Sequence, residues 1–455
     1  MDMKPGGQNF EPLISIIMPL YNAERFLEET LVSISNQIFR DYELICINDG
    51  SEDGTENIVY RFQQNDSRIR VLCNEKRAGA AFSRNRGIRE ARGKYIIFLD
   101  GDDIFDEMLL FLAYQKAEQT HADIVMFECI HVSSQHIYEK QEIKHSEGYV
   151  SRFCVEPKTV EDISPCDFLL WYSELGSKLF RKDFIIHNQI QFQDLPNDND
   201  TYFVDMAYYL ANRIIKLDTP RVMVYARVHF TPSRISANRT PMCIYYAMSK
   251  VRDELEKRGI FEKYYKMFNY KAFYLLIGGM MNAKTSQIRN DYRDFLINEG
   301  FNRVLNGYGE KYGINQFIEC KRNQFVGLES AEKWKDIYSF FEVFLYENLD
   351  RISELFQEYK KQNLKIGVWG AGNNGRIFME FCNNNNLYID GIIDKDEARA
   401  GERCGNCLIQ LPHEAGSFDV IISTPQRMYE AVKKEAKAYK ADIVIIDIYS
   451  FTCMI

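Results

Sequence analysis

Three carboxylates lie within four positions of the stretch KYIIFLDGDDIF (94–105), at Asp100, Asp102 and Asp103. They follow an unbroken apolar run, Tyr95 to Leu99, which predicts a buried strand. Like charges this close oppose one another's ionisation, so the cluster needs a cation or a strong hydrogen-bond donor nearby. Carboxylate oxygens are the ligands that Mg²⁺ and Mn²⁺ prefer in proteins. We therefore predict a divalent metal site with Asp102 and Asp100 as ligands.

The residues around this cluster alternate between predicted strands and predicted helices. Five short apolar runs give the strands, at 13–19, 42–49, 69–73, 95–99 and 122–127. This alternation is typical of βαβ units, and it predicts an α/β fold with a mostly parallel sheet covered on both faces. The first helix is expected to begin with Asn22 as its cap. One face of that helix carries Phe26, Leu27, Thr30, Leu31 and Ile34.

Ligands of an open parallel sheet sit outside the carboxyl ends of its strands. At those ends the chain offers Pro19 and Tyr21 behind the first strand, Asp49 behind the second, and the acidic cluster behind the fourth. The Tyr21 ring can stack on a base, and the Asp49 carboxylate can accept a hydrogen bond from a base or a ribose. A divalent ion bridging a pyrophosphate would neutralise the carboxylates and, as a Lewis acid, carry charge that develops on a departing phosphate.

Three segments now carry a resemblance to a known family: SIIMPLYNAERFLEETLVSISNQ (15–37), ELICINDGSEDGT (43–55) and AFSRNRGIREARGKYIIFLDGDD (81–103). In this order they resemble the opening strand and helix, the second strand and turn, and the stretch leading into the D-x-D motif of the inverting glycosyltransferases of family two. That family has the GT-A nucleotide-sugar-binding fold. The resemblance covers about the first 105 residues.

Several residues at the sheet edge receive a role from this resemblance. It assigns the nucleoside pocket to Pro19 and Tyr21, the base contact to Asp49, the phosphate to Arg84, the ribose to Asp100 and the metal to Asp102. From the residues alone other interpretations stay open. An Asp before a Gly is also a turn residue, carboxylates also suit a helix N-terminus, and an Arg often pairs with a surface acid.

The transfer also needs a base that deprotonates the acceptor hydroxyl as it attacks the anomeric carbon, and a nearby carboxylate does this in general-base catalysis. The family places it in a Glu-Asp pair that heads a helix, downstream of a Lys-Phe stretch. Here SKLFRKDF (177–184) resembles the stretch, and Asn199 and Asp200 align with the pair, so the family's Glu is absent. The resemblance implies Asp200 as the base, with Asp198 as the nearest substitute. A polar loop that only caps a helix remains the alternative.

The rest of the chain changes character twice. Signals mix over 162–230, where SKLFRKDFI (177–185) and YFVDMAYYLANRI (202–214) are predicted as helices, and 241–362 is predicted to be helical throughout. That helical segment could dock an acceptor chain, a membrane surface or a second subunit, although a connector that packs the domains together is the simplest interpretation. The predicted domains are 1–240 (nucleotide-sugar binding and catalysis), 241–362 (helical) and 363–455 (a Rossmann-like domain).

The last domain is centred on GAGNNG (370–375), which fits G-x-G-x-x-G. The motif follows a predicted strand and opens a helix, and Asp394 ends the next strand, which is the context of a Rossmann phosphate-binding turn. Gly370, Gly372 and Gly375 would let the backbone approach a phosphate at the helix N-terminus. The domain resembles the small Rossmann-like modules of polysaccharide-biosynthesis proteins. A second nucleotide, a regulatory ligand and plain structural docking all stay open.

Composition and charge limit the classes of protein to which this chain can belong. The 455 residues are 46% hydrophobic and 27% charged, which is typical of a globular chain of two or three domains. A net charge of −9 gives no reason to expect nucleic acid or an anionic membrane as the main partner. No apolar run is long enough to cross a bilayer and the start is no signal peptide, so we expect a cytoplasmic protein. Peripheral contact with the inner face of the membrane stays open, and the oligomeric state is not indicated.

The cysteines and histidines give no metal site. Eleven cysteines are scattered singly apart from Cys404 and Cys407, which predicts reduced thiols rather than a disulfide framework. This C-x-x-C pair lacks a second pair and is followed only by His413, so two thiols in a turn are expected. Any metal should therefore lie at the carboxylates.

The leading hypothesis is an inverting, metal-dependent glycosyltransferase that moves a sugar from a UDP-linked donor to a glycan or lipid-linked acceptor in surface-polysaccharide assembly. The rival hypothesis is a catalytically inactive nucleotide-binding interaction protein whose working part is the C-terminal module. Asn199, in place of the family's Glu, keeps that rival open. An NAD-dependent dehydrogenase that uses GAGNNG would leave the acidic edge unexplained.

Overall fold

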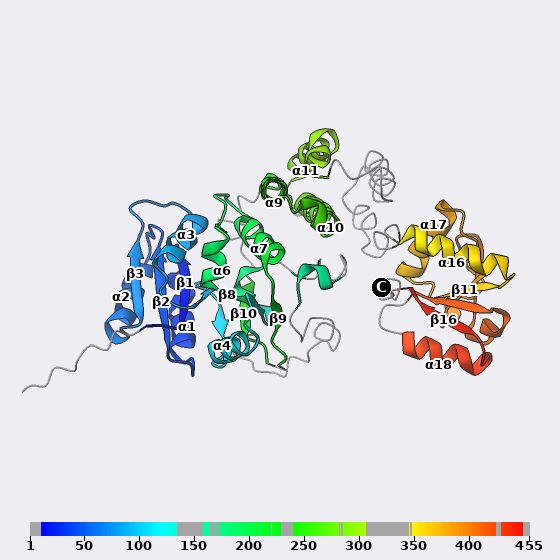
Figure 1. The fold of residues 1–455 in the computed structure, drawn as a ribbon, viewed down its shortest axis with the longest axis horizontal. Helices are drawn as coiled ribbons and strands as arrows, with labels where there is room; N and C mark the ends of the chain where they lie inside the picture. The colour runs from blue at the N-terminus through cyan, green and yellow to red at the C-terminus, as the bar shows by residue number, and fades with distance from the viewer. Residues whose placement is uncertain are drawn as a thin grey trace, which may run out of the picture. The chain divides into compact units, whose positions relative to one another are not determined.

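The structure, a computed structural model, describes residues 11–133, 158–163, 168, 171, 173–219, 221–228, 240–281, 283, 285–305, 345, 348–424 and 429–448. The chain forms two compact units, Met1–Val304 and Leu305–Ile455. Their helices and strands run from blue to green in the first unit and from yellow to red in the second (Figure 1). The three-domain division predicted from the sequence stays a prediction.

The first unit is built on a seven-stranded sheet. Its strands are, in spatial order, β3 (Ile69–Cys73), β2 (Tyr42–Asn48), β1 (Ile14–Leu20), β4 (Tyr95–Phe98), β8 (Lys178–Arg181), β6 (Ile124–Met126) and β9 (Ile214–Lys216). The first four are parallel, β8 is antiparallel to β4 and β6, and β9 is parallel to β6. The predicted α/β class with a large, mostly parallel sheet is therefore confirmed.

Helices cover this sheet as the alternation predicted. They are α1 (Glu24–Ser35), α2 (Thr55–Asn65), α3 (Ala80–Glu90), α4 (Leu109–Thr120) and α6 (Lys182–His187). Ile14, Ile16 and Met18 of β1 pack with Leu27 and Leu31 of α1 in one buried core. On β1 they alternate with residues of the opposite face, as a strand requires.

The predicted cap of α1 is wrong. The residue before the helix is Ala23, which makes no side-chain cap bond. Asn22 has a left-handed backbone with φ of 51°, a conformation that Asn tolerates better than most residues. Its Oδ1 accepts a hydrogen bond from the Glu52 N–H at 2.9 Å. Asn22 therefore ties the end of β1 to the turn after β2.

The predicted helix over 177–185 is also wrong in its first half. Residues Lys178–Arg181 form β8, and only α6 after it is helical. Leu179 and Phe180 are both buried because β8 lies inside the sheet, between two neighbours. A short run that is apolar on both faces has no period that separates a strand from a buried helix.

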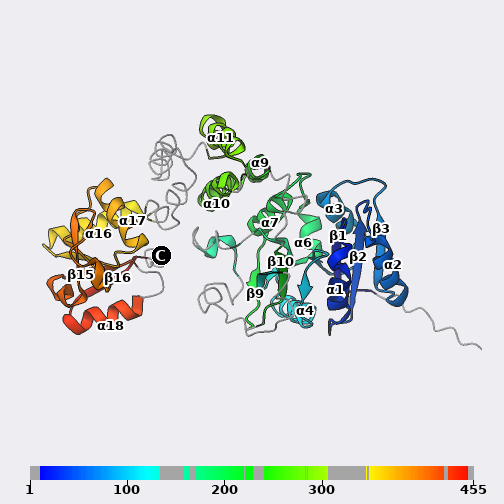
Figure 2. The same cartoon turned by 180° about the vertical axis from the view of Figure 1, so that it is seen from behind.

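A second, three-stranded sheet and a group of helices complete the first unit. The small sheet has β5 (Ile104–Phe105), β10 (Val224–Val228) and β7 (Cys129–Ser133), in that order. The helices are α7 (Asn199–Leu210), α9 (Met242–Lys257), α10 (Phe261–Met281), α11 (Ser286–Phe295) and α12 (Phe301–Leu305). Short helical turns occupy Val160–Asp162, Leu175–Ser177 and Leu296–Gly300. α9 packs on α7, and α10 packs on α9 and α11 (Figure 2).

The segment predicted as helical over 241–362 is helical where the structure describes it, apart from short connections. Its last helix is α16 (Leu349–Lys361), which belongs to the second unit. Residues 306–344 lie outside the described residues. Among the described helices, none is both long enough and apolar enough to cross a bilayer.

The second unit holds a six-stranded sheet. Its strands are, in spatial order, β13 (Arg403–Cys404), β14 (Cys407–Gln410), β12 (Gly391–Ile393), β11 (Ile366–Trp369), β15 (Val420–Ser423) and β16 (Val444–Asp447). All neighbours are parallel except the hairpin of β13 and β14. The helices are α17 (Asn373–Asn384) and α18 (Tyr429–Tyr439), with helical turns at Glu397–Arg399 and Pro412–Ser417.

The hairpin of β13 and β14 was not predicted. Cys404 and Cys407 face each other across it as free thiols, and the residues between them are Gly405 and Asn406. Gly-Asn between two strands is a hairpin signal. The strands are too short to show alternation, so the sequence indicated only a turn.

The start of α17 lies against the end of β11 so closely that it requires glycine. A Cβ added at Gly375 would lie 1.7 Å from the Gly370 carbonyl oxygen, a backbone atom that cannot move aside alone. At Gly372, three residues earlier, a Cβ would enter open space with no atom within 4 Å. The two glycines of one motif therefore have different roles.

Replacing Gly375 with alanine is expected to destabilise the second unit by at least about 2 kcal/mol, since overpacking against fixed atoms costs roughly 1–3 kcal/mol or more. Differential scanning calorimetry of the full chain measures this as a lower melting temperature for that unit. Gly372→Ala is the matched control, with an expected shift close to zero. Equal shifts for the two variants would contradict the packing argument.

Candidate functional site

The acidic turn follows β4 and packs against the end of β1. Asp100 is exposed, Asp102 and Asp103 are half-buried, and Gly101 between them is buried. A Cβ on Gly101 would lie 2.4 Å from Leu20 Cδ2, so glycine lets the turn sit this close to β1. Close packing of the glycine thereby fixes the position of the carboxylates on either side of it.

Arg227 of β10 holds the same turn from another side. Its backbone N–H donates to Asp103 Oδ1 at 3.0 Å, and its Nε donates to the Asp102 carbonyl oxygen at 2.6 Å. The guanidinium is buried, pairs with Glu29 and lies over the Phe26 ring at 4.5 Å from its centroid. The sequence did not predict this contact of Arg227, because the turn lies 124 residues earlier in the chain.

The turn has the electrostatics of a cation site. Burial, together with the charges of Asp100 and Asp102, raises the pKa of Asp103 to about 8. Among the described residues no three His, Cys, Asp or Glu side chains converge to hold a metal by themselves. Mg²⁺ is typically bound through one or two carboxylates while phosphates and water complete its shell. The residues present therefore fit a divalent ion whose ligands would be carboxylates of the turn together with oxygens of a diphosphate.

Arg84 of α3 joins this turn to a distant part of the chain. It is buried, and its Nη2 lies 3.0 Å from Asp100 Oδ1 while its Nη1 donates to Asn199 Oδ1 at 3.0 Å. Its guanidinium also lies 5.5 Å from the centroid of the Phe192 ring. The acidic turn and the start of α7, which were predicted separately, are therefore neighbours joined by one side chain.

The nucleoside end of the predicted site lies behind β1 and β2. Pro19 and Tyr21 are half-buried, whereas Asp49 is only 3% exposed. The Asp49 carboxylate accepts hydrogen bonds from the backbone N–H groups of Ala78 and Gly79, each at 2.8 Å. Asp49 thus positions the loop between β3 and α3, and its contact with a base stays a prediction.

A further cation at this end was not foreseen. The Arg77 guanidinium lies over the Tyr21 ring, 4.1 Å from its centroid, and belongs to the loop that Asp49 holds. Tyr21, whose ring was predicted to stack on a base, is half-buried. Arg77 thus adds positive charge beside the predicted base-stacking residue, which suits a base attached to phosphates.

The start of α7 carries the predicted base. Asp200 is half-buried in the first helical turn. Burial raises its pKa to about 6, the charge of Arg84 opposes this shift and the charge of Asp198 adds to it. Asp198 precedes the helix with φ of 53° and makes no side-chain cap bond. Capping therefore does not account for Asp198.

Asn199 stands where the family's Glu was expected, and its contacts give a physical reason. Its Oδ1 accepts the hydrogen bond from Arg84, and its Nδ2 donates to the Leu195 carbonyl oxygen at 3.3 Å. Arg84 already pairs with the Asp100 carboxylate, so the amide satisfies a second guanidinium N–H without adding another negative charge. An amide also donates to the carbonyl, which a carboxylate cannot do.

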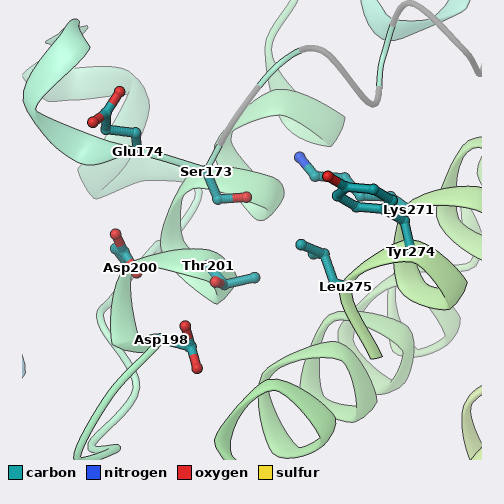
Figure 3. A pocket seen from close by; sticks show the side chains of 8 residues that line it. All are labelled: Ser173, Glu174, Asp198, Asp200, Thr201, Lys271, Tyr274 and Leu275. Carbon is teal, nitrogen blue, oxygen red and sulfur yellow. The ribbon is translucent and has the colours of Figure 1, made fainter. Parts of the chain in front are cut away.

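A cavity of about 220 Å³ lies beside Asp200 (Figure 3). It is lined by Ser173, Glu174, Asp198, Asp200, Thr201, Lys271, Tyr274 and Leu275. The three carboxylates lie on one side of it, and the α10 residues lie on the other. Sequence reasoning did not predict Glu174 or any of the α10 residues as part of the site, because only the tertiary fold brings α10 to α7.

Glu174 is the unpredicted carboxylate of this cavity. His131 Nε2 lies 3.3 Å from its Oε1, and the Cys129 thiol donates to the same oxygen at 3.7 Å. Burial favours the neutral acid, but the hydrogen bond from His131 and the charge of Lys178 hold the pKa of Glu174 below its usual range. Its charge also contributes to the raised pKa of Asp103. The charge of Glu174 therefore acts on the acidic turn as well as on the cavity.

Two buried lysines belong to this region, Lys271 in the cavity lining and Lys178 outside it. Lys271 is 2% exposed, and its Nζ lies 2.7 Å from Asp205 Oδ1, an atom that also accepts from Ser173 Oγ at 2.7 Å. Lys178 is 1% exposed and its Nζ donates to Ser177 Oγ at 2.9 Å. Burial lowers the pKa of Lys178 to about 8. The Lys271 and Asp205 pair joins α10 to α7 inside the core.

The glycine turn of the second unit has its own polar contacts. Asp394, at the end of β12, accepts from the Ala371 N–H at 2.6 Å, and Arg399 Nη1 donates to the Ala371 carbonyl at 3.1 Å. Thr424, after β15, donates to the Gly370 carbonyl at 3.2 Å. The predicted residues Gly370 and Asp394 are thus brought together, and Asp394 helps to hold the turn itself.

The match to a family model lies within the first unit. Residues 15–171 match the family model for glycosyl transferase family 2. Glycosyltransferase GlyG of Streptococcus pneumoniae is 30% identical over 215 residues, which are 45% of this chain and 67% of GlyG. The GalNAc(5)-diNAcBac-PP-undecaprenol beta-1,3-glucosyltransferase of Campylobacter jejuni is 35% identical over 114 residues, 25% of this chain and 37% of that protein. The chain thus spans about two thirds of the first relative and little more than a third of the second.

A solved structure has the same fold. Residues 1–349 of S. aureus TarS, crystallised in complex with UDP-GlcNAc, superpose with a TM-score of 0.54 at 19% identity. The match covers 71% of this chain and 90% of that one. The superposition supports a shared GT-A-like fold, and at this low identity it says nothing about the ligands of this chain.

Proposed function

This chain belongs to glycosyl transferase family 2, and from that premise we propose that it is an inverting, metal-dependent glycosyltransferase. The proposed donor is a UDP-sugar, and the proposed acceptor is a glycan or a lipid-linked glycan in surface-polysaccharide assembly. A lipid-linked acceptor would bring the protein to the cytoplasmic face of the membrane without a spanning helix of its own.

One observation supports this proposal most strongly. Arg84 contacts both Asp100 of the acidic turn and Asn199, the neighbour of Asp200. The transfer needs a donor diphosphate site and a base within one sugar ring of each other. In this chain the acidic turn is the candidate diphosphate site and Asp200 is the candidate base. The Arg84 guanidinium lies between the turn and Asn199, the residue next to Asp200.

The proposed reaction is a direct displacement at the anomeric carbon. Asp200 takes the proton from an acceptor hydroxyl while that oxygen attacks the anomeric carbon and the bond from that carbon to the diphosphate oxygen breaks. Attack from the face opposite the leaving diphosphate inverts the configuration. A carboxylate with a pKa near 6 is ionised at neutral pH yet basic enough to accept a proton.

The acidic turn serves the donor in this proposal. A divalent ion held by Asp102 and Asp100 would supply Lewis-acid stabilisation of the departing diphosphate. Arg84 keeps Asp100 oriented and offers positive charge nearby, while Arg227 fixes the backbone of the turn. Pro19, Tyr21 and Asp49 line the proposed nucleoside pocket, with Arg77 over the Tyr21 ring.

The test is donor turnover. The full chain is incubated with a panel of nucleotide sugars, Mn²⁺ and a broad panel of glycan acceptors, and free nucleoside diphosphate is measured. We expect release from one donor that depends on the metal. Tight nucleotide binding without turnover over the whole panel would favour the rival, an inactive nucleotide-binding interaction protein.

For the second unit we propose a Rossmann-like module that binds a nucleotide without chemistry. Counting from β11, its parallel strands lie in the order third, second, first, fourth, fifth, which is the order of the dinucleotide fold. The point where that order reverses lies between β11 and β15, next to Gly370 and Thr424. A phosphate would sit there, at the N-terminus of α17, with Gly372 against it.

Ligand binding by the second unit is expected to appear in calorimetry. The full chain is screened with NAD, UDP-sugars and S-adenosylmethionine, and a ligand at a hundredfold excess over its Kd should add roughly 2.7 kcal/mol to stability. Gly372→Ala should abolish that gain without changing the melting temperature of the free protein, because its Cβ would meet the phosphate and nothing else. Failure of every nucleotide to shift this transition would leave the module a structural one.

A further inference from the structure

The cavity beside Asp200 has two unlike sides. Its first side carries oxygen atoms, from the three carboxylates and from the hydroxyls of Ser173 and Thr201. Its second side is α10, where Tyr274 and Leu275 present a ring and an isobutyl group (Figure 3). Sugars have matching surfaces, since their hydroxyls form a polar rim around faces of C–H groups.

The net charge of the cavity decides which groups it can hold. Lys271 is the cation among the lining residues, and its charge is matched by Asp205 at 2.7 Å while its Nζ also donates to the Trp171 carbonyl at 3.0 Å. The cavity wall also carries the three carboxylates of Glu174, Asp198 and Asp200. The charge of Lys178 acts on Glu174 and that of Arg84 acts on Asp200, but neither cation lines the cavity. A phosphate or carboxylate placed here would face all three at short range, whereas a hydroxyl could donate to any of them.

The size of the cavity limits its occupant to about one sugar ring. Sites for drug-sized ligands enclose roughly 300–1,000 Å³, and this one encloses about 220 Å³. A single sugar ring is therefore the scale of ligand that fits. The diphosphate and lipid of a lipid-linked acceptor would have to remain outside.

We infer that this cavity is the acceptor subsite, that it takes one uncharged sugar ring, and that α10 forms its apolar wall. The ring stacks on Tyr274 and Leu275, and its hydroxyls donate to the carboxylates opposite, so that the attacking hydroxyl reaches Asp200. The inference rests on the proposed function for the identity of the base, and it adds the helical segment to the substrate site. It also excludes acceptors whose receiving sugar carries a phosphate or a carboxylate.

The test measures binding separately from turnover. Octyl glycosides of glucose, galactose, N-acetylglucosamine and N-acetylgalactosamine are titrated into the full chain, each beside the same glycoside with a 6-phosphate. Saturation-transfer NMR in the presence of UDP and Mn²⁺ reports contact with the ring. We expect at least one neutral glycoside to bind and its 6-phosphate to bind at least tenfold more weakly. Equal or tighter binding of the phosphorylated form would overturn the inference, as would failure of every neutral glycoside to bind.

Two variants localise the binding. Leu275→Trp should fill the cavity and weaken glycoside binding at least tenfold while UDP binding stays unchanged. Ile288→Trp on α11 is the matched control, because Ile288 is 38% exposed and does not line the cavity. If Leu275→Trp misfolds, Tyr274→Leu keeps the test open, with an expected several-fold loss of glycoside binding. Unchanged glycoside binding in folded Leu275→Trp would place the acceptor elsewhere.

The two levels of proposal fail differently. If UDP binding and donor turnover are absent while a neutral glycoside still binds in a Leu275-dependent way, the proposed function fails and the cavity remains a sugar site. The opposite case is intact donor turnover in which Leu275→Trp binds glycosides as well as the wild type does, and the 6-phosphates bind as well as the neutral glycosides do. In that case the acceptor subsite fails and the transferase proposal stands.

Discussion

Replacing Asp200 with asparagine is expected to lower kcat of sugar transfer by about 10²–10⁴-fold, the usual contribution of a general base. The amide keeps the size and shape of the side chain but cannot accept the proton from the acceptor hydroxyl. UDP binding should be unchanged, because Asp200 lies on the acceptor side of Arg84. Steady-state kinetics with the donor that the turnover assay selects measures the loss.

The pH profile gives a second measurement of the same role. A base works in its deprotonated form, so kcat/KM of the wild type should fall as the pH drops through about 6, the raised pKa of Asp200. An aspartate with an ordinary pKa of about 3.9 would keep the rate flat to much lower pH. Asp200→Asn should remove this inflection, and Asp194→Asn, an exposed neighbour outside the cavity, should keep it. A full rate in Asp200→Asn would move the role to Asp198 or Glu174.

Replacing Asp102 with alanine is expected to lower kcat/KM at least about a hundredfold, because metal stabilisation of a leaving diphosphate is worth several kcal/mol and each 1.36 kcal/mol is tenfold in rate. Excess chelator should have the same effect on the wild type, and Mn²⁺ should reverse it. Donor turnover at saturating acceptor is the measurement.

Glu107→Gln is the matched control for this variant. Glu107 is an exposed carboxylate five positions later, in contact only with Arg221 at 3.9 Å among the ion pairs of the described residues. Its removal should leave the rate and the metal requirement unchanged. Transfer that continues in chelator, together with an Asp102→Ala enzyme of normal rate, would rule out a metal at the acidic turn.

The sequence predicted those parts of the fold that depend on local pattern. The parallel strands before residue 100 are buried runs flanked by amphipathic helices, so their type and their places along the chain followed from the periodicity. The acidic edge followed from one rule about the carboxyl ends of parallel strands. The approximate start of α7 and the proximity of Asp200 to it were predictable for the same reason, because polar residues precede an apolar helix.

Contacts made by the tertiary fold were beyond such reasoning. β8 was predicted as helix because a four-residue strand inside a sheet has no visible period. The contacts of Arg227 and Lys271 join residues far apart in the sequence, and only the small sheet and α10 bring these two side chains to the site. One available signal was passed over. A lysine inside the apolar run KLF, Lys178, had to be buried and therefore needed partners in the core.

The buried pair of Lys271 and Asp205 also bears on how this chain can change over evolution. Loss of one partner would strand the other charge in the core at a cost of roughly 3–5 kcal/mol, a large part of a typical domain's stability. Asp205 of α7 and Lys271 of α10 both lie beyond residues 15–171, which the family model matches. Recombination that exchanged the helices for those of a relative would have to bring a compatible charge with them. Substitutions within α10 that keep Lys271 preserve this pair, and under the acceptor subsite inferred above they would be a route to new acceptor preferences.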